Sequence, residues 1–136
     1  MSAARSKGTK HESAIVNFLR EHGFSFADRV PLSGSRDRGD VTLGPGSPVI
    51  EAKNQSRHSL AEWLDEANAE AANAGAPFGV VWAHRRGKGS PGDGYVVLDG
   101  HSFVKLLHEA GYAWEPPLPG RTPTDDERNP APRVES

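Results

Sequence analysis

The chain has 136 residues, of which 25% are charged and 35% hydrophobic, and its formal net charge is −2. This length fits one compact domain, and the absence of cysteine excludes disulfides, thiolate zinc sites and cysteine nucleophiles. Any metal must therefore bind to oxygen or histidine ligands. No apolar run approaches the roughly 20 residues of a membrane-spanning helix, and the polar N-terminus lacks a signal-peptide core, so we expect a soluble cytoplasmic protein with no membrane partner.

Charges and prolines are unevenly distributed along the chain. Residues 1–60 contain nine basic and six acidic side chains, a positive excess that suits a polyanionic partner. Six of the eleven prolines follow Trp114, and no apolar periodicity survives there. Such a segment cannot bury enough surface to offset its ordering entropy. The expected organisation is a basic N-terminal arm over residues 1–7, a folded domain over 8–113 and a Pro-rich flexible tail over 114–136.

The folded domain begins with a predicted amphipathic helix and an edge strand. Thr9 and Glu12 fit a capping box, apolar residues then recur at helical spacing, and Gly23 provides a C-cap, so we expect a helix that starts at Thr9. Residues 24–30 alternate in polarity and stop at Pro31, as a strand at the edge of a sheet does.

The remaining elements follow from the same two periodicities. Strands 40–43 and 49–53 are expected to form a hairpin, and a helix over 59–74 follows, capped by Ser59 and ended by Gly75. Strands 78–83 and 95–98 then flank a long turn, and the last helix runs from Asp99 or Ser102 to Ala110. The order helix, three strands, helix, two strands, helix predicts an α/β fold with one mixed sheet. Glu62, Glu66 and Glu70 are expected on the solvated face of the second helix, although Glu66 could approach a bound metal.

Three ionisable side chains project from one face of the predicted hairpin: Asp40, Glu51 and Lys53. Two carboxylates at close range repel each other unless a hard divalent cation lies between them, and Mg²⁺ prefers such a shell of carboxylates and water. A lysine on the same face can stabilise charge on a phosphoryl group, or orient and deprotonate a water. The pattern therefore predicts metal-assisted phosphodiester hydrolysis. The alternative is an ordinary cross-strand cluster of ion pairs on a solvated face.

These residues resemble a family motif. Gly39-Asp40, an eleven-residue step and then Glu51-Ala52-Lys53 are similar to the motif of the PD-(D/E)XK nucleases. The Lys7-Gly8 pair, the Gly23-Phe24 turn and the Ser33-Gly34-Ser35 loop are similar to archaeal-type Holliday junction resolvases and their phage relatives. The resemblance implies a restriction-endonuclease-like αβββαβ core, with a mixed central sheet flanked by helices.

The resemblance also assigns roles. It implies that Asp40 and Glu51 bind Mg²⁺, or Mn²⁺ as a substitute, with help from the Ala52 carbonyl, and that Lys53 is the catalytic lysine. Glu12 matches an acidic residue of the first helix that reaches the metal, although a capping-box glutamate needs no catalytic role. The sequence departs from the motif in two ways: Gly39 replaces the proline, and Asp37 competes as the first aspartate. Residues Trp63 to Glu66 also resemble a Trp-x-x-Gln segment of phage nucleases, with Glu66 in place of the glutamine.

Candidate DNA contacts lie in the N-terminal arm, the loop before Asp40 and the Gly-rich turn after residue 83. Guanidinium groups near a metal site suit bidentate phosphate contacts, while a solubilising role is the alternative. The candidates are Arg5, Lys7, Lys10, Ser33, Ser35, Arg36, Arg38, Arg57, Arg85 and Arg86.

The expected function is a Mg²⁺-dependent endodeoxyribonuclease of DNA recombination and repair, most similar to resolvases that cut four-way junctions, in a bacterial or phage-infected cell. Two symmetric incisions require a homodimer with two active sites. Three alternatives stay open. They are a repair, nicking or restriction-type nuclease, a noncatalytic DNA-binding module on the same fold, and an interaction protein that works through its Pro-rich tail.

Overall fold

The computed structural model describes residues 3–31 and 38–113, and the chain divides into two compact units, residues 1–98 and 99–136. The first unit holds a five-stranded mixed sheet in the order β1-β2-β3-β4-β5. The α/β class with one mixed sheet is thus confirmed. The strands are β1 (Asp28–Arg29), β2 (Val41–Thr42), β3 (Val49–Lys53), β4 (Gly79–Ala83) and β5 (Tyr95–Val97).

Neighbouring strands are antiparallel except for β3 and β4, which are parallel. A parallel pair needs a crossover connection, and helix α2 (Leu60–Ala74) provides it. The β4–β5 connection contains the short 3₁₀ helix η1 (Pro91–Asp93), within the long turn that the sequence predicts. The order of elements in this unit is α1, β1, β2, β3, α2, β4, η1, β5.

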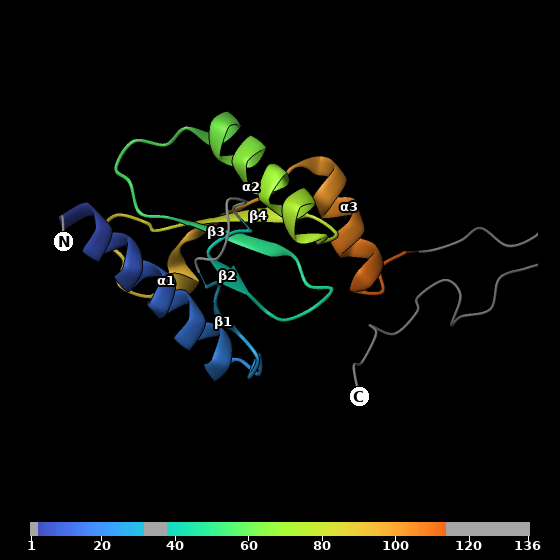
Figure 1. Ribbon diagram of the computed structural model, residues 1–136, viewed down its shortest axis with the longest axis horizontal. Coiled ribbons are helices and arrows are strands. Elements are labelled where there is room, and N and C mark those ends of the chain that lie inside the picture. The colour runs from blue at the N-terminus through green and yellow to red at the C-terminus, as the bar shows by residue number, and fades with distance from the viewer. Residues whose placement is uncertain (1–2, 32–37, 114–136) are drawn as a thin grey trace, which may run out of the picture. The chain divides into compact units, whose positions relative to one another are not determined.

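Helices α1 (Ala3–Glu21) and α2 cover opposite faces of the sheet (Figure 1, blue and green). On one face, Ile15 of α1 belongs to a buried cluster with Val41 and Ile50. On the other face, Trp63 and Ala67 of α2 pack on β4. All five residues of β4 are buried, because this strand lies between β3 and β5 and its alternate side chains enter the two clusters. The chain thus forms a three-layer helix–sheet–helix unit around β3 and β4.

The expected helix start at Thr9 is wrong, because α1 begins at Ala3 and Thr9 lies inside it. The alanines at the start favour helix, and the single Gly8 does not interrupt it. Glu12 is therefore not a capping-box residue. The capping-box signature identified a helix here but placed its first turn too late.

The expected strand over residues 24–30 shrinks to the two residues of β1. The amide of Phe24 donates to Leu19 O and that of Ala27 donates to Phe24 O, so these groups close turns instead of pairing with a strand. Phe24 and Phe26 are 49% and 83% exposed, which shows that their alternation does not reflect a buried face. Only the last residues before Val30 join the sheet, at its edge.

The ends of α2 follow the expected residues in part. Gly75 adopts the left-handed conformation (φ 67°) and its N–H bonds the carbonyls of Ala71 and Ala72, as a C-cap glycine does. Ser59 occupies the N-cap position, but its side chain makes no capping hydrogen bond. Leu60 and Ala74, expected in the buried stripe, are exposed.

The second unit contains helix α3 (Gly100–Glu109). Asp99 caps the N-terminus of this helix, because its side chain accepts a hydrogen bond from the Ser102 amide (2.8 Å). Phe103 and Leu106, expected to face inward, are 49% and 42% exposed. The expected boundary between domain and tail adjoins residues 114–136, which lie outside the described residues. Within the described ranges, no helix has the length and apolarity needed to cross a membrane.

Candidate active site

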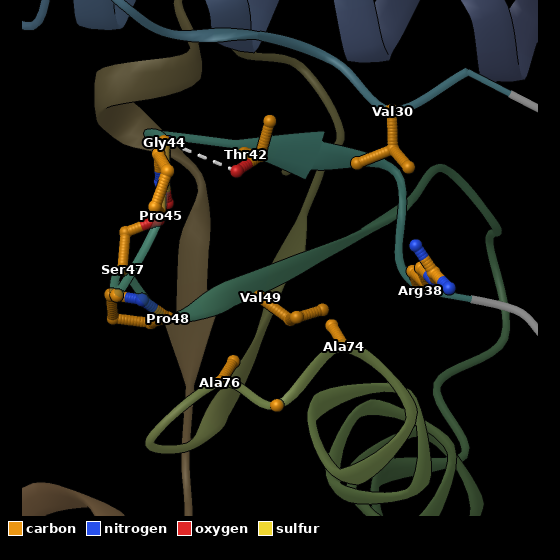
Figure 2. Close-up of a pocket in the computed structure, with 12 residues that line it drawn as sticks. Val30, Arg38, Thr42, Gly44, Pro45, Ser47, Pro48, Val49, Ala74 and Ala76 are labelled. Carbon is orange, nitrogen blue, oxygen red and sulfur yellow. Dashed lines mark hydrogen bonds between the residues drawn. The ribbon is translucent and has the colours of Figure 1, made fainter.

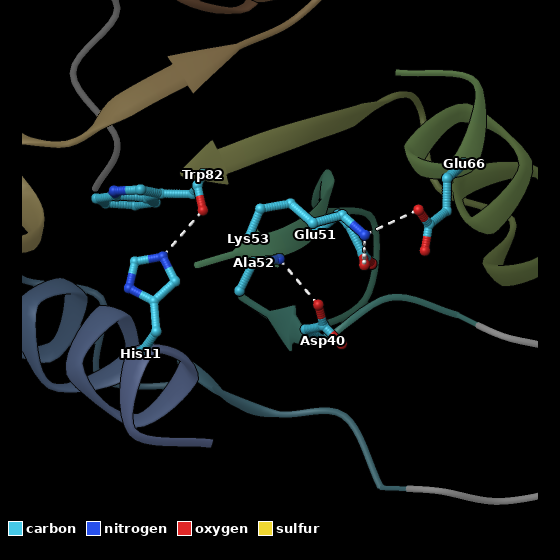
Figure 3. A network of polar contacts seen from close by, with 7 residues as sticks. All are labelled: His11, Asp40, Glu51, Ala52, Lys53, Glu66 and Trp82. Atoms are coloured by element: carbon cyan, nitrogen blue, oxygen red, sulfur yellow. Dashed lines mark hydrogen bonds and ion pairs between the residues drawn. The ribbon is translucent and has the colours of Figure 1, made fainter. Parts of the chain in front are cut away.

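The backbone around Gly39 fixes the direction of Asp40. Gly39 has φ +94°, and a Cβ there would collide with the side chain of Val49. The Asp40 amide donates to Ile50 O (3.0 Å), and its Oδ2 accepts a hydrogen bond from the Ala52 amide (2.9 Å; Figure 3). The Asp40 carboxylate is therefore held against β3. Proline, the motif residue that Gly39 replaces, cannot adopt this positive φ.

Gly39→Ala is expected to destabilise the protein by about 1–3 kcal/mol, because it combines a strained φ with a steric collision. Gly44 is the matched control, since its φ is +114° but nothing lies within 4 Å of its hypothetical Cβ. Urea unfolding of both alanine variants measures the effect. An equal loss of stability at the two positions would show that the Val49 contact contributes nothing.

Glu51 and Lys53 project from β3 toward α2, where Glu66 meets them. Lys53 Nζ lies 3.3 Å from Glu51 Oε1 and donates to Glu66 Oε2 at 2.9 Å (Figure 3). The side chains of Glu51 and Lys53 are only 7% and 13% exposed. An ordinary cluster of ion pairs on a solvated face would not be buried in this way.

Glu70 is a site residue that the sequence analysis missed. It was expected on the solvated face of α2 but is only 2% exposed, and this expectation was wrong. Its signal was the helical spacing, because Glu70 follows Trp63 by seven residues and Ala67 by three, and both of these are buried. Glu51, Glu66 and Glu70 each offer a carboxylate oxygen within 4.8 Å of the other two. We call these three residues the acidic triad.

Burial and neighbouring carboxyl groups raise the pKa of Glu51 to about 11. Burial contributes most, followed by a hydrogen bond with Glu70 and the charges of Asp40, Glu70 and Glu66. Burial lowers the pKa of Lys53, but the hydrogen bond with Glu66 and the charge of Glu51 outweigh it, so that this pKa is raised. In the protein without a cation, Glu51 therefore keeps its proton at neutral pH while Lys53 stays charged.

The residues of this cluster fit a hard divalent cation. Glu51 Oε2 is buried, and no ammonium, guanidinium or amide group that the structure describes donates a hydrogen bond to it. Its neighbours are carboxyl groups, the ligand type that Mg²⁺, Mn²⁺ and Ca²⁺ prefer. A cation there would favour the ionised form of Glu51, which the protein alone disfavours.

The set of ligands differs from the one implied by the resemblance. Glu51 belongs to the acidic triad with two residues of α2, and Asp40 lies beside it. Glu12 instead accepts a hydrogen bond from Arg29 Nε (3.1 Å) and comes from the helix on the opposite face of the sheet. A metal-binding role for Glu12 and for the Ala52 carbonyl stays a prediction.

His11 anchors α1 to the central strand near this site. Its Nε2 lies 3.0 Å from Trp82 O, and the ring is 5% exposed (Figure 3). Because a carbonyl only accepts, this contact requires the proton on Nε2. Burial lowers the pKa of His11 and keeps the ring neutral.

Several predicted DNA contacts gather in one groove of about 360 Å³. Lys7 of α1 meets Arg85 and Arg86 of the turn after β4, and residues 54–56, which directly follow Lys53, form part of the wall. His58 and His84 also line the groove. Residues from both ends of the first unit thus form a groove lined by three basic side chains, which we call the cationic groove.

Of the remaining candidates, those whose side chains the structure describes do not line this groove. Arg38 lines a separate pocket of about 290 Å³, between the Gly44–Pro48 turn and the end of α2 (Figure 2). Lys10 and Arg57 are exposed. Outside the described residues lie Ser33, Ser35, Arg36, Asp37 and the side chain of Arg5.

Comparisons with known proteins found no relative: no family model, no curated protein and no solved structure matches the chain.

Proposed function

We propose that the protein is a metal-dependent endonuclease that hydrolyses DNA phosphodiester bonds, on a restriction-endonuclease-like core. One observation carries the proposal. The buried carboxyl of Glu51 lies among the carboxyl groups of Glu66 and Glu70 and within 3.3 Å of the ammonium group of Lys53. Cation ligands and a fixed positive charge are the two components that metal-assisted phosphodiester hydrolysis needs.

The arrangement of elements supports the same proposal. The first six elements follow the αβββαβ order, and only β2 runs against its neighbours among the first four strands. Asp40 directly precedes β2, and Glu51 and Lys53 lie on β3. The residues that resemble the motif therefore lie on or next to the β2–β3 hairpin, which supports the proposal.

In the proposed mechanism the carboxyl groups hold the cation and the lysine provides a fixed positive charge. Glu51, Glu66, Glu70 and Asp40 would hold Mg²⁺, which when bound would supply Lewis-acid activation of water and of the phosphate. Lys53 is held by Glu51 and Glu66 with a raised pKa, so it stays protonated. It therefore acts as a positive charge that orients the water or stabilises the negative charge developing on the phosphoryl oxygens, and not as a general base.

The cationic groove supports DNA as the substrate. Three basic side chains converge in it although the whole chain carries a net charge of −2. Such a local patch suits the phosphate backbone, which supplies most of the nonspecific affinity for DNA.

The preferred shape of the DNA is tested by cleavage of matched four-way-junction, nicked and linear duplexes with Mg²⁺. A resolvase acting as a homodimer makes paired symmetric nicks confined to the junction. Cleavage of all three substrates would keep the nuclease and remove the junction specificity. Binding of the junction without cleavage of any substrate would favour the noncatalytic DNA-binding module.

A further inference from the structure

A second groove of about 480 Å³ adjoins the cationic groove and has a different chemical character. Leu60 and Trp63 of α2 and Tyr95 and Val96 of β5 line it. Leu60, Tyr95 and Val96 are between 44% and 49% exposed, which is unusual for large apolar side chains that meet in one depression. Its volume lies within the roughly 300–1,000 Å³ typical of small-molecule sites.

Two aromatic rings join the grooves. His58 and Tyr95 line both of them, and their ring centroids lie 5.9 Å apart. His58 also lies 5.5 Å from the Trp63 ring, and the Arg85 guanidinium stands 5.6 Å from the centroid of Tyr95. A ligand that crosses this boundary meets cations on one side and flat apolar surface on the other.

We propose that the apolar groove receives the base of an unpaired nucleotide whose phosphates lie in the cationic groove. This inference rests on the proposed function and names its substrate class, which is DNA with an unpaired or extruded base beside the cleaved bond. Among the ligands of a nuclease, only a nucleotide carries a negatively charged phosphate and a flat apolar ring close enough together to occupy two adjoining grooves. A paired base cannot enter, because its edges and faces are occupied within the duplex.

The charge pattern is the argument for this occupant. Sites for unpaired nucleotides combine a positive path for the backbone with aromatic side chains that stack on bases. Here Lys7, Arg85 and Arg86 form the positive path, and Tyr95 with His58 provides the rings. A purely apolar partner would leave the adjoining cations unused.

The test measures binding of fluorescein-labelled duplexes to the full chain in EDTA, so that no cleavage occurs. One duplex carries a single bulged adenine, and the matched duplex carries a bulged abasic nucleotide, which has the same backbone without the base. We expect the adenine bulge to bind about tenfold tighter, the size of one stacking interaction. Tyr95→Ala and Leu60→Ala should each reduce this preference, while Tyr95→Phe should retain it.

Two control variants separate the contributions. Arg86→Gln should weaken both duplexes equally, because it contacts only the backbone. Phe26→Ala removes an aromatic ring that is 83% exposed and lines neither groove, and it should change nothing. Leu60→Ala serves as the informative variant if Tyr95→Ala does not fold.

Equal affinity of the wild type for the two bulged duplexes would overturn the inference. A concentration-dependent dimer that Leu60→Ala dissociates, without a base preference, would overturn it and assign the groove to a second copy of the chain. The two proposals fail separately, because base preference is measured in EDTA and cleavage is measured in a parallel assay with Mg²⁺. A base preference in EDTA without cleavage in Mg²⁺ would refute only the nuclease, and cleavage in Mg²⁺ without a base preference in EDTA would refute only the base site.

Discussion

Glu51→Gln is expected to reduce metal-dependent DNA cleavage by on the order of 10³-fold and to leave the metal-free protein at least as stable as the wild type. Glutamine removes a charged cation ligand but has the shape of a protonated glutamate. The pKa of Glu51 is raised to about 11, so the wild-type side chain is already neutral at pH 7 without a cation. The same substitution therefore separates activity from stability.

Mg²⁺ provides the second part of this experiment. When the free concentration of a cation is about 100 times its dissociation constant, binding stabilises the folded protein by about 2.7 kcal/mol, which is measured as a rise in Tm. We expect this rise in the wild type and its loss in Glu51→Gln. Glu62→Gln is the matched control, because Glu62 lies on the exposed surface of α2. A large loss of metal-free stability in Glu51→Gln would contradict the account, since it would mean that the Glu51 carboxylate stabilises the fold.

The metal-free protein is expected to lose stability as the pH rises above neutrality. Glu51 has a raised pKa in the folded state, about 11 against 4.5, so folding retains a proton that the unfolded chain releases. The stabilisation is complete below about pH 4.5 and is lost as the pH rises toward 11. The expected slope of the unfolding free energy is up to about 1.4 kcal/mol per pH unit, the value for one proton.

Chemical denaturation between about pH 7 and 9 measures this slope. The range lies above the ordinary pKa of His11, 6.5, and burial lowers that pKa further in the folded protein, so His11 titrates mainly below this range. Saturating Mg²⁺ should flatten the slope, since the cation takes the place of the proton. Glu51→Gln should flatten it without metal. A slope that persists in Glu51→Gln would place the titrating group elsewhere.

The sequence predicted the hairpin and its two faces well, because both depend on a period of two residues. Val41 and Ile50 enter the core under α1, while Glu51 and Lys53 turn toward α2. The sequence analysis assigned Glu70 to solvent because glutamate is usually exposed, although its helical spacing from Trp63 and Ala67 places it on the buried face of α2. Glu70 interacts with Glu51, which comes 19 residues earlier in the chain, and no local pattern contains that contact.

The other misses have two different causes, one local and one tertiary. The alternation around Phe24 resembles a strand, yet turn hydrogen bonds at Phe24 and Ala27 use the amides that a strand would need. The cationic groove joins Lys7 to Arg85, which are far apart in the chain and meet only because α1 packs against the sheet. Sequence spacing could nominate these side chains but could not bring them together.

The most direct test of the proposed nuclease is cleavage of a four-way DNA junction by wild type and Asp40→Asn, with Mg²⁺ and with EDTA. Asparagine can still accept the hydrogen bond from the Ala52 amide, so the fold is retained while the charge is removed. Asp65→Asn, at an exposed position of α2, is the control. The account predicts Mg²⁺-dependent cleavage that Asp65→Asn keeps and Asp40→Asn loses. Cleavage that survives in Asp40→Asn, or that proceeds equally in EDTA, would contradict it.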